Sequence, residues 1–304
     1  MTGSRGLVLV YDVGGSHISA AVFEPENCAV QNVVSAGYPA QQTFDTFLDV
    51  FDSLRTAAAG NGSAILGVSA AMPGPFDYEN GVSWIKHKLT YLYGLDLRGA
   101  LAARMGCAPS AVRFLNDAAA YLQGEISGGA ARCVERVVGI TLGTGIGSAF
   151  GMNGHVVREG AGVAPGGEIW NLPYQGGILE DQISTRALRK SYQSRTGQDR
   201  EVAEIAASAA DDPVAAETFH DFGCALGTAL STVLATFAPE VIVIGGGIAR
   251  SAPLFLPAAQ AELGNLRAQL RVSILDENAP LVGAGAAWFE IENSLSAVPP
   301  TNVS

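Results

Sequence analysis

Apolar residues near the start of the chain follow a pattern that predicts two strands joined by a tight turn. The apolar run 7–10 leads through a turn of mostly small residues, 12–16, into a second apolar run, 18–23. Short apolar runs bounded by turn residues are typical of buried strands. A further buried-strand pattern follows at 65–68 and leads into Pro73-Gly74-Pro75.

The same order of positions returns in the second half of the chain. The apolar run 137–140 leads through the glycine-rich turn 141–147 into residues 148–150, and a later buried-strand pattern, 241–244, runs into three glycines. This repeat at the scale of a domain indicates two halves of similar construction.

Helical spacing of apolar residues predicts most of what lies between the strands. Thr43 is suited to cap a helix in which Phe44, Phe47 and Phe51 share one face and which ends near Gly60. Further helices are expected over 96–104, 118–125, 179–192, 213–237, 253–270 and 283–295, and further strands over 64–71, 112–115 and 271–275.

Strands that lead and helices that follow, twice over, predict an α/β fold. A chain of 304 residues is long enough for two domains that each bury a core. We expect an N-terminal domain over residues 1–117 and a C-terminal domain over 118–304. The C-terminal helix, about 288–304, is expected to pack back on the first domain.

Composition and charge exclude several classes of partner. A net charge of −11 argues against nucleic acid, which is bound by an excess of Lys and Arg. The first apolar run is too short, and is interrupted too soon by Asp12, for a signal peptide or a membrane span, so a cytoplasmic protein without a membrane partner is expected. Neither a disulfide framework nor a zinc knuckle is predicted from the scattered Cys28, Cys107, Cys133 and Cys224.

The turn 12–16 has the composition of a phosphate-binding loop. Its glycines let backbone N–H groups approach an anion, Ser16 adds a hydroxyl donor, and Asp12 can face a Mg²⁺ ion through water. The same residues would also suit an ordinary hairpin turn. The second copy of the loop favours a ligand, because two such loops facing one another would enclose a nucleotide.

Five motifs in order resemble those of the ROK family of sugar kinases and repressors, over nearly the whole chain. They are Asp12-x-Gly14-Gly15-Ser16, Leu115-Asn116-Asp117 with Gly124-Glu125, Thr141-Leu142-Gly143-Thr144-Gly145, Gly166-Gly167-Glu168 with Leu179-Glu180 and Ser184, and Gly245-Gly246-Gly247. The resemblance implies duplicated actin-like, ribonuclease H-like ATPase domains with a cleft between them. It also implies ATP-dependent phosphorylation of a hydroxyl on a hexose or hexose derivative, with Mg²⁺ arriving with the ATP.

The resemblance further implies two sets of site residues. The set expected to bind ATP and phosphate is Asp12, Gly14, Gly15, Ser16, Thr141, Gly143, Thr144, Gly145, Gly245, Gly246 and Gly247. The set expected to bind the sugar is Gly74, His87, Lys88, Asn116, Asp117, Glu168, Asn171 and Glu180. The other histidines, His17, His155 and His220, are interpreted as structural.

Asp117 is the expected general base, because a carboxylate beside the sugar hydroxyl can accept its proton during phosphoryl transfer. Asn116-Asp117 before a run of alanines is also a good helix N-cap pair. The two roles are compatible, since a helix N-terminus favours the ionised carboxylate. Glu168 and Glu180 suit a sugar, because a carboxylate readily accepts hydrogen bonds from hydroxyl groups. The ordinary alternative for either glutamate is a solvated position on the protein surface.

Two stretches depart from the family's pattern, both on the sugar side. The resemblance implies a histidine soon after Glu168 and a cysteine cluster before Glu180, which together hold a structural zinc; residues 169–179 contain neither His nor Cys, and we predict no zinc. Lys86-His87-Lys88 stands where glucose-type relatives often have an asparagine. Substituting His87 or Lys88 is therefore expected to change sugar preference and to leave ATP affinity nearly unchanged.

Alternatives to a sugar kinase stay open. The family's repressors carry a DNA-binding segment before the kinase-like fold, whereas here the first strand is expected by residue 7 and the net charge is wrong for DNA. The missing histidine favours, mildly, a sugar- or nucleotide-binding regulator that has lost catalysis. Polyphosphate could replace ATP, although more basic residues would then be expected. A homodimer is compatible with the sequence.

Overall fold

The computed structural model describes residues 7–39, 41–86 and 88–296, with side chains to residue 291. They form two compact units. Unit 1 contains the described residues up to Gly128 and from Asn278 onward, and unit 2 contains Gly129–Glu277. No helix among the described residues is long and apolar enough to cross a membrane.

Unit 1 is built on a five-stranded sheet in the order β3-β2-β1-β4-β7. The first three strands are antiparallel neighbours, whereas β4 and β7 run parallel to β1. The strands are β1 (Leu7–Val13), β2 (His17–Glu24), β3 (Ala29–Gly37), β4 (Ile65–Met72) and β7 (Val112–Asn116), with a small pair β5 (Phe76–Asp77) and β6 (Val82–Ser83) beside them.

Four helices complete unit 1. They are α1 (Phe44–Ala59), α2 (Leu97–Met105), α3 (Asp117–Ser127) and α9 (Ala279–Ser296). Thr43 caps α1 by accepting a hydrogen bond from the Thr46 N–H, as the sequence predicts. Phe47 and Phe51 lie on the buried face of this helix. Tyr11 of β1 stacks on Phe51 and donates its hydroxyl to the Phe51 carbonyl at 3.2 Å, which fastens α1 to the sheet.

Helices α3 and α9, far apart in sequence, pack closely because two glycines face each other. A Cβ on Gly124 would lie 2.0 Å from the Ala279 carbonyl oxygen, and one on Gly283 would lie 1.8 Å from that of Ala120. Trp288 of α9 is buried over Gly67 of β4, where a side chain would not fit. Thus α3, which the sequence-based division placed in the second domain, belongs to unit 1, as does α9.

Unit 2 repeats the sheet of unit 1, in the order β10-β9-β8-β13-β14. Again the first three strands are antiparallel neighbours, and β13 and β14 run parallel to β8. The strands are β8 (Arg136–Leu142), β9 (Ile146–Met152), β10 (His155–Val157), β13 (Val241–Gly245) and β14 (Gln269–Val272), and a separate hairpin joins β11 (Pro173–Tyr174) to β12 (Gly177–Ile178). The shared strand order confirms the internal repeat and the α/β class.

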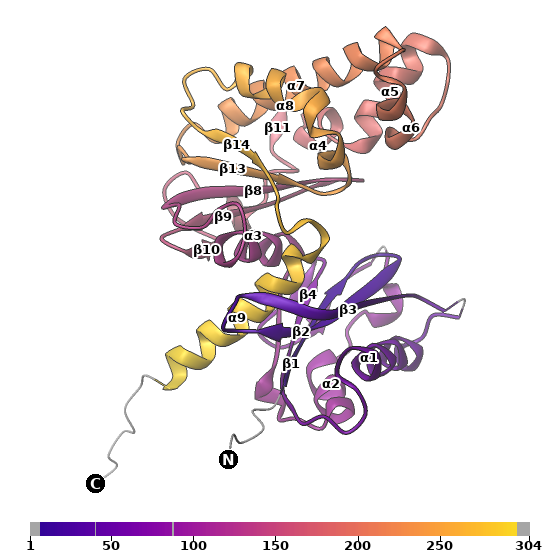
Figure 1. Cartoon of the computed structure of the whole chain (residues 1–304), viewed down its shortest axis with the longest axis vertical. Coiled ribbons are helices and arrows are strands. Elements are labelled where there is room, and N and C mark those ends of the chain that lie inside the picture. Colours follow the sequence, from indigo (N-terminus) through magenta and orange to yellow (C-terminus); the bar gives the residue numbers. More distant parts are fainter. Residues whose placement is uncertain (1–6, 40, 87, 297–304) are drawn as a thin grey trace. The chain divides into compact units, whose positions relative to one another are not determined.

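Helices α7 and α8 pack side by side in unit 2 (Figure 1). Their approach also depends on glycine, since a Cβ on Gly223 or Gly227 would lie 2.2 Å from a carbonyl oxygen of α8. The helices of this unit are α4 (Leu179–Gln182), α5 (Thr185–Thr196), α6 (Val202–Ser208), α7 (Pro213–Val233) and α8 (Ala252–Glu262).

Three expected elements of unit 2 were wrong in extent. The helix expected over 179–192 is two helices, because the Ser184 hydroxyl accepts from the Ala187 N–H and begins α5 anew. The helix expected over 253–270 ends at Glu262, where the Gln260 side chain bonds Ala268 and Leu270 and joins the helix to β14. The long helix expected to reach 237 ends at Val233 and continues as a hydrogen-bonded turn.

Candidate active site

The loop between β1 and β2 is held by Tyr38, while the Gly14 N–H donates to the His17 carbonyl at 3.0 Å. The Tyr38 hydroxyl donates to the Gly14 carbonyl at 2.7 Å, and the Tyr38 N–H donates to the Ser16 carbonyl at 3.3 Å. The N–H groups of Gly15 and Ser16 have no acceptor among the described residues, and both residues are exposed. Successive unpaired N–H groups of this kind form an anion-binding concavity.

Asp12 lies half-buried at the end of β1, directly before this loop. Removal from water, and secondarily the Asp117 carboxylate, raises the pKa of Asp12 to about 7. The structure therefore brings together two carboxylates that are 105 positions apart in the sequence. A carboxylate that is partly removed from water beside another one is stabilised in its charged form by a cation such as Mg²⁺.

Asp117 and Asn116 take different places at the start of α3. Asn116 is the N-cap, and its side-chain oxygen accepts from the Ala119 N–H at 3.1 Å. Asp117 is the first residue of the helix, exposed, and its Oδ1 accepts from the Ala118 N–H at 2.8 Å. The carboxylate thus lies at the positive end of the helix dipole.

Asn116 is oriented by Tyr78, a neighbour that the sequence did not reveal. The Asn116 amide donates to the Tyr78 hydroxyl at 3.2 Å, and this hydroxyl donates to the Met72 carbonyl at 3.1 Å. A Cβ on Gly74 would lie 3.6 Å from the same hydroxyl. One N–H and one lone pair of the Asn116 amide remain for a ligand.

Lys88 lies against the first loop. A Cβ on Gly15 would meet the Lys88 Cδ at 2.7 Å and its Nζ at 3.5 Å, so the lysine side chain occupies the space that a side chain at position 15 would take. His17 is exposed beside the loop, with Nδ1 3.2 Å from the Ser16 hydroxyl. His87 lies outside the described residues.

In unit 2, the loop between β8 and β9 has a glutamate packed against it. The Gly143 N–H donates to the Gly145 carbonyl at 3.0 Å, which closes the loop and leaves Thr144 exposed at its tip. Glu180 Oε2 accepts from the Ile146 N–H at 3.1 Å, and a Cβ on Gly145 would lie 2.3 Å from the same oxygen. The structure therefore brings Glu180, expected to bind sugar, to the loop expected to bind phosphate.

The glycines after β13 lie against the same strand end. Gly246 has a φ of 83°, and a Cβ there would lie 2.5 Å from the Leu142 carbonyl oxygen, so only glycine fits. Thr141 is half-buried at the end of β8. A Cβ added to Gly247 would meet no heavy atom within 4 Å, which leaves this face of the turn open to a ligand.

Glu168 and Glu180 are carried by segments that are tied to one another. The Glu180 N–H donates to the Trp170 carbonyl at 3.1 Å, and the Trp170 ring N–H donates to Glu168 Oε2 at 2.9 Å. The buried Ser148 hydroxyl links the Gly167 carbonyl and the Ile169 N–H and so fixes this segment to β9. Asn171 is exposed next to Trp170.

The hairpin β11–β12 occupies the stretch where the resemblance implies a zinc site. Its turn uses Gln175 and Gly176, both with positive φ, as a two-residue hairpin turn requires. Among residues 7–39, 41–86 and 88–296, no group of three or more His, Cys, Asp or Glu side chains is placed to hold a metal ion.

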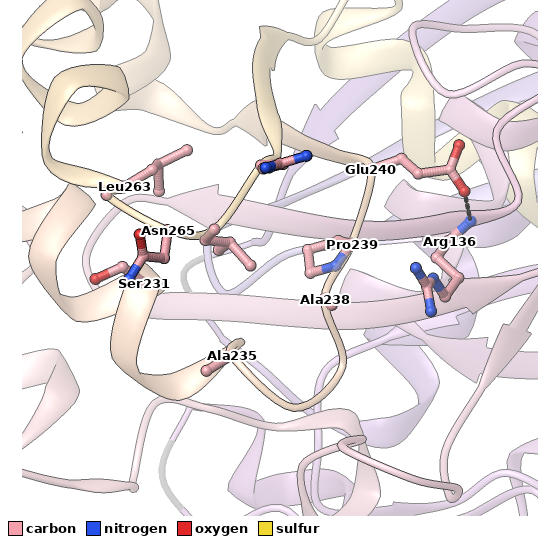
Figure 2. A pocket seen from close by; sticks show the side chains of 11 residues that line it. Arg136, Ser231, Ala235, Ala238, Pro239, Glu240, Leu263 and Asn265 are labelled. Carbon is pink, nitrogen blue, oxygen red and sulfur yellow. Dashed lines mark hydrogen bonds between the residues drawn. The ribbon is translucent and has the colours of Figure 1, made fainter.

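A pocket of about 630 Å³ lies where the unit 2 strands β8, β13 and β14 begin (Figure 2). Arg136, at the start of β8, donates its backbone N–H to Glu240 at 3.2 Å, and the apolar residues that line the pocket include Ala235, Ala238 and Pro239. Ligands of open parallel sheets bind beyond the carboxyl ends of the strands. The loop 143–145 and Gly246 are at those ends, so this pocket is separate from the candidate phosphate site.

Comparisons with known proteins agree with this geometry. The model of the ROK family matches residues 8–290. The glucokinase of Thermotoga maritima is 26% identical over 266 residues, which cover 79% of this chain and 81% of the relative. The xylose repressor of Bacillus subtilis is 24% identical over 291 residues, which cover 90% and 74%.

The crystal structure of the ROK hexokinase from Thermus thermophilus superposes with a TM-score of 0.77 at 25% identity, covering 94% of this chain and 99% of that one. Its fold is the actin-like ATPase fold, which confirms the expected fold class. Because the family model matches residues 8–290, nearly the whole chain, the protein belongs to the ROK family.

Proposed function

We propose that this protein transfers a phosphoryl group from ATP to a hydroxyl group of a hexose or hexose derivative. The proposal is supported by membership of the ROK family and by the glucokinase of Thermotoga maritima as a relative. Both glycine loops and the Gly245–Gly247 turn are of the kind that holds phosphates through backbone N–H groups.

The observation that carries the proposal is the exposed Asp117 carboxylate beside Asp12. Asn116 caps α3, so helix capping does not require Asp117. In the proposed step Asp117 accepts the proton of the attacking sugar hydroxyl while a bond forms from its oxygen to the γ-phosphorus. The bond from that phosphorus to the bridging oxygen breaks, and ADP leaves with the electron pair.

Mg²⁺ that arrives with ATP would be held through Asp12 and would neutralise charge on the phosphates. The sugar would be recognised by Asn116, Glu168, Asn171 and Glu180, whose amide and carboxylate groups suit hydroxyls. Glu180 would then serve two partners, the sugar and the Ile146 N–H.

The test is an ADP-release screen over hexoses, N-acetylhexosamines and nucleosides, with polyphosphate as an alternative donor. We expect ATP-dependent turnover with at least one hexose or hexose derivative. Turnover with nucleosides alone, or with polyphosphate and not ATP, would contradict the proposal.

A second candidate is a sugar-responsive regulator, which the relationship to the Bacillus subtilis xylose repressor favours. A regulator would bind a sugar measurably, for instance by calorimetry, and would show no turnover with any donor in the same screen.

A further inference from the structure

Lysine is scarce in this chain, and its placement is informative. Only three lysines occur among 304 residues: Lys86, Lys88 and Lys190. Lys190 is exposed on α5 of unit 2. Lys86 lies over the ring of Tyr93, 5.2 Å from its centroid. Lys88 alone of the three has its aliphatic chain against a glycine loop.

The described arginines of unit 1 are all engaged elsewhere. Arg55 and Arg104 pair with Asp52 and Asp49, at 3.0 and 2.7 Å. Arg98 donates to backbone carbonyls, among them that of Glu79 at 2.7 Å, and Arg113 donates to the Trp288 carbonyl. Lys88, in contrast, is exposed and has no ion-pair or hydrogen-bond partner in the part of the chain that the structure describes.

The surroundings of the Lys88 ammonium are those of an anion site. It lies beside Gly15, whose N–H, with that of Ser16, also has no acceptor among the described residues. The Ser16 hydroxyl, 3.2 Å from His17 Nδ1, lies in the same loop. A positive charge, two backbone N–H groups and a hydroxyl suit phosphate oxygens better than a neutral sugar hydroxyl.

We propose that Lys88 binds the terminal phosphates of the donor at the loop 14–16, rather than the sugar. The inference rests on the proposed function. In the transfer step the ammonium donates a hydrogen bond to a non-bridging oxygen and keeps its proton, while Asp117 receives the proton of the sugar hydroxyl. Charge that accumulates on the phosphate oxygens in the transition state is thereby balanced.

The sequence alone assigned Lys88 to the sugar side, and the two assignments predict different results. Because the native chain has only three lysines, lysine-selective acetylation followed by mass spectrometry reports Lys88 directly, with Lys86 and Lys190 as internal references. Mg²⁺ with AMP-PNP should slow acetylation of Lys88 by at least about fivefold, whereas adenosine should not. Protection by glucose without nucleotide, or no protection by AMP-PNP, would overturn the proposal.

Variants give a second, independent readout. Lys88→Met should weaken binding of Mg²⁺–AMP-PNP by about tenfold and leave adenosine binding unchanged, because a hydrogen bond to a charged group is lost. Lys88→Arg should restore most of this affinity, and Lys190→Met should match the wild type. With the sugar found in the screen, kcat should fall and the KM for sugar should stay within about twofold of wild type.

These measurements separate two kinds of failure. If the wild type phosphorylates no sugar, the proposed function fails, yet protection and AMP-PNP affinity still test Lys88 as a phosphate ligand. If the wild type is active and Lys88→Met raises the KM for sugar with unchanged AMP-PNP affinity, the role in phosphate binding is excluded.

Discussion

Asn116 and Asp117 are adjacent in sequence, but Asn116 caps α3 and Asp117 is the proposed general base. The variant Asp117→Asn tests the role of Asp117 as the base. Asn keeps the shape of the side chain and cannot take the hydroxyl proton. Because Asn116 is the N-cap, stability should change little. A general base contributes about 10²–10⁴-fold, so kcat should fall at least about a hundredfold with sugar affinity largely kept.

The control is Asn116→Ala, which should cost about 1 kcal/mol of stability through loss of the cap. Measurement of kcat, sugar Kd and Tm on both variants separates base from cap. An Asp117→Asn enzyme with near-normal kcat would remove this residue from the mechanism.

Asp12 makes stability depend on pH. Its pKa is raised in the folded protein to about 7, from an ordinary 3.8. Between pH 3.8 and about 7 the folded state keeps a proton on Asp12 that the unfolded state has lost. The free energy of unfolding is therefore highest at low pH and falls as the pH rises to about 7. Asp12→Asn removes the titration, so between pH 4 and 8 its free energy of unfolding should rise relative to wild type by about 3–4 kcal/mol.

Urea unfolding of both proteins across that range, without nucleotide or metal, measures the difference. Identical pH dependence would show that Asp12 ionises normally. Since a cation needs the ionised carboxylate, Mg²⁺-dependent activity of the wild type should rise with pH through about 7.

At the scale of the elements, the hairpin β8–β9 depends on the absence of a side chain at Gly145. Gly145→Ala would place a methyl group 2.3 Å from Glu180 Oε2 and break the bond to the Ile146 N–H. We expect a loss of about 1–3 kcal/mol in stability and weaker nucleotide binding. Gly143→Ala, whose Cβ would meet nothing within 4 Å, should retain stability; equal losses in both variants would contradict the role of Glu180.

The hairpin β11–β12 supports a prediction about metal. It is held by its own strand pairing and by the bond from the Leu179 N–H to the Leu172 carbonyl at 3.0 Å. With neither His nor Cys between Glu168 and Glu180, chelator treatment should leave Tm unchanged. Near-stoichiometric zinc by elemental analysis of protein purified without chelator would refute this.

At the scale of the whole molecule, the last helix completes the first unit of the chain. Gly283→Ala would drive a methyl group to within 1.8 Å of the Ala120 carbonyl oxygen on α3. Helix propensity alone would make this change stabilising by about 1 kcal/mol. We expect instead a loss of at least about 2 kcal/mol, because two backbones must separate. Chemical unfolding decides the sign, and a more stable variant would exclude the close packing of α3 on α9.

Much of this protein could be predicted from the sequence because it is encoded locally. Strand runs such as 7–10, the Thr43 cap and the glycine loops depend on a few neighbouring residues, and their repetition indicated two similar halves. Local patterns failed where a distant or side-chain contact decided an element's end, as at Ser184 and Gln260. Strand β3 and helix α6 carried no pattern strong enough to predict them.

The α/β class, the order of the motifs and the residue types able to hold phosphate are encoded locally, since periodicity and glycine placement are properties of adjacent positions. Tertiary structure alone decided which of those residues meet. Asp12 acquires its pKa from burial and from Asp117, Gly15 lies under Lys88, and Gly145 lies under Glu180. Each of these pairs is separated by at least 35 positions, and only the folding of the sheets brings them within reach of one another.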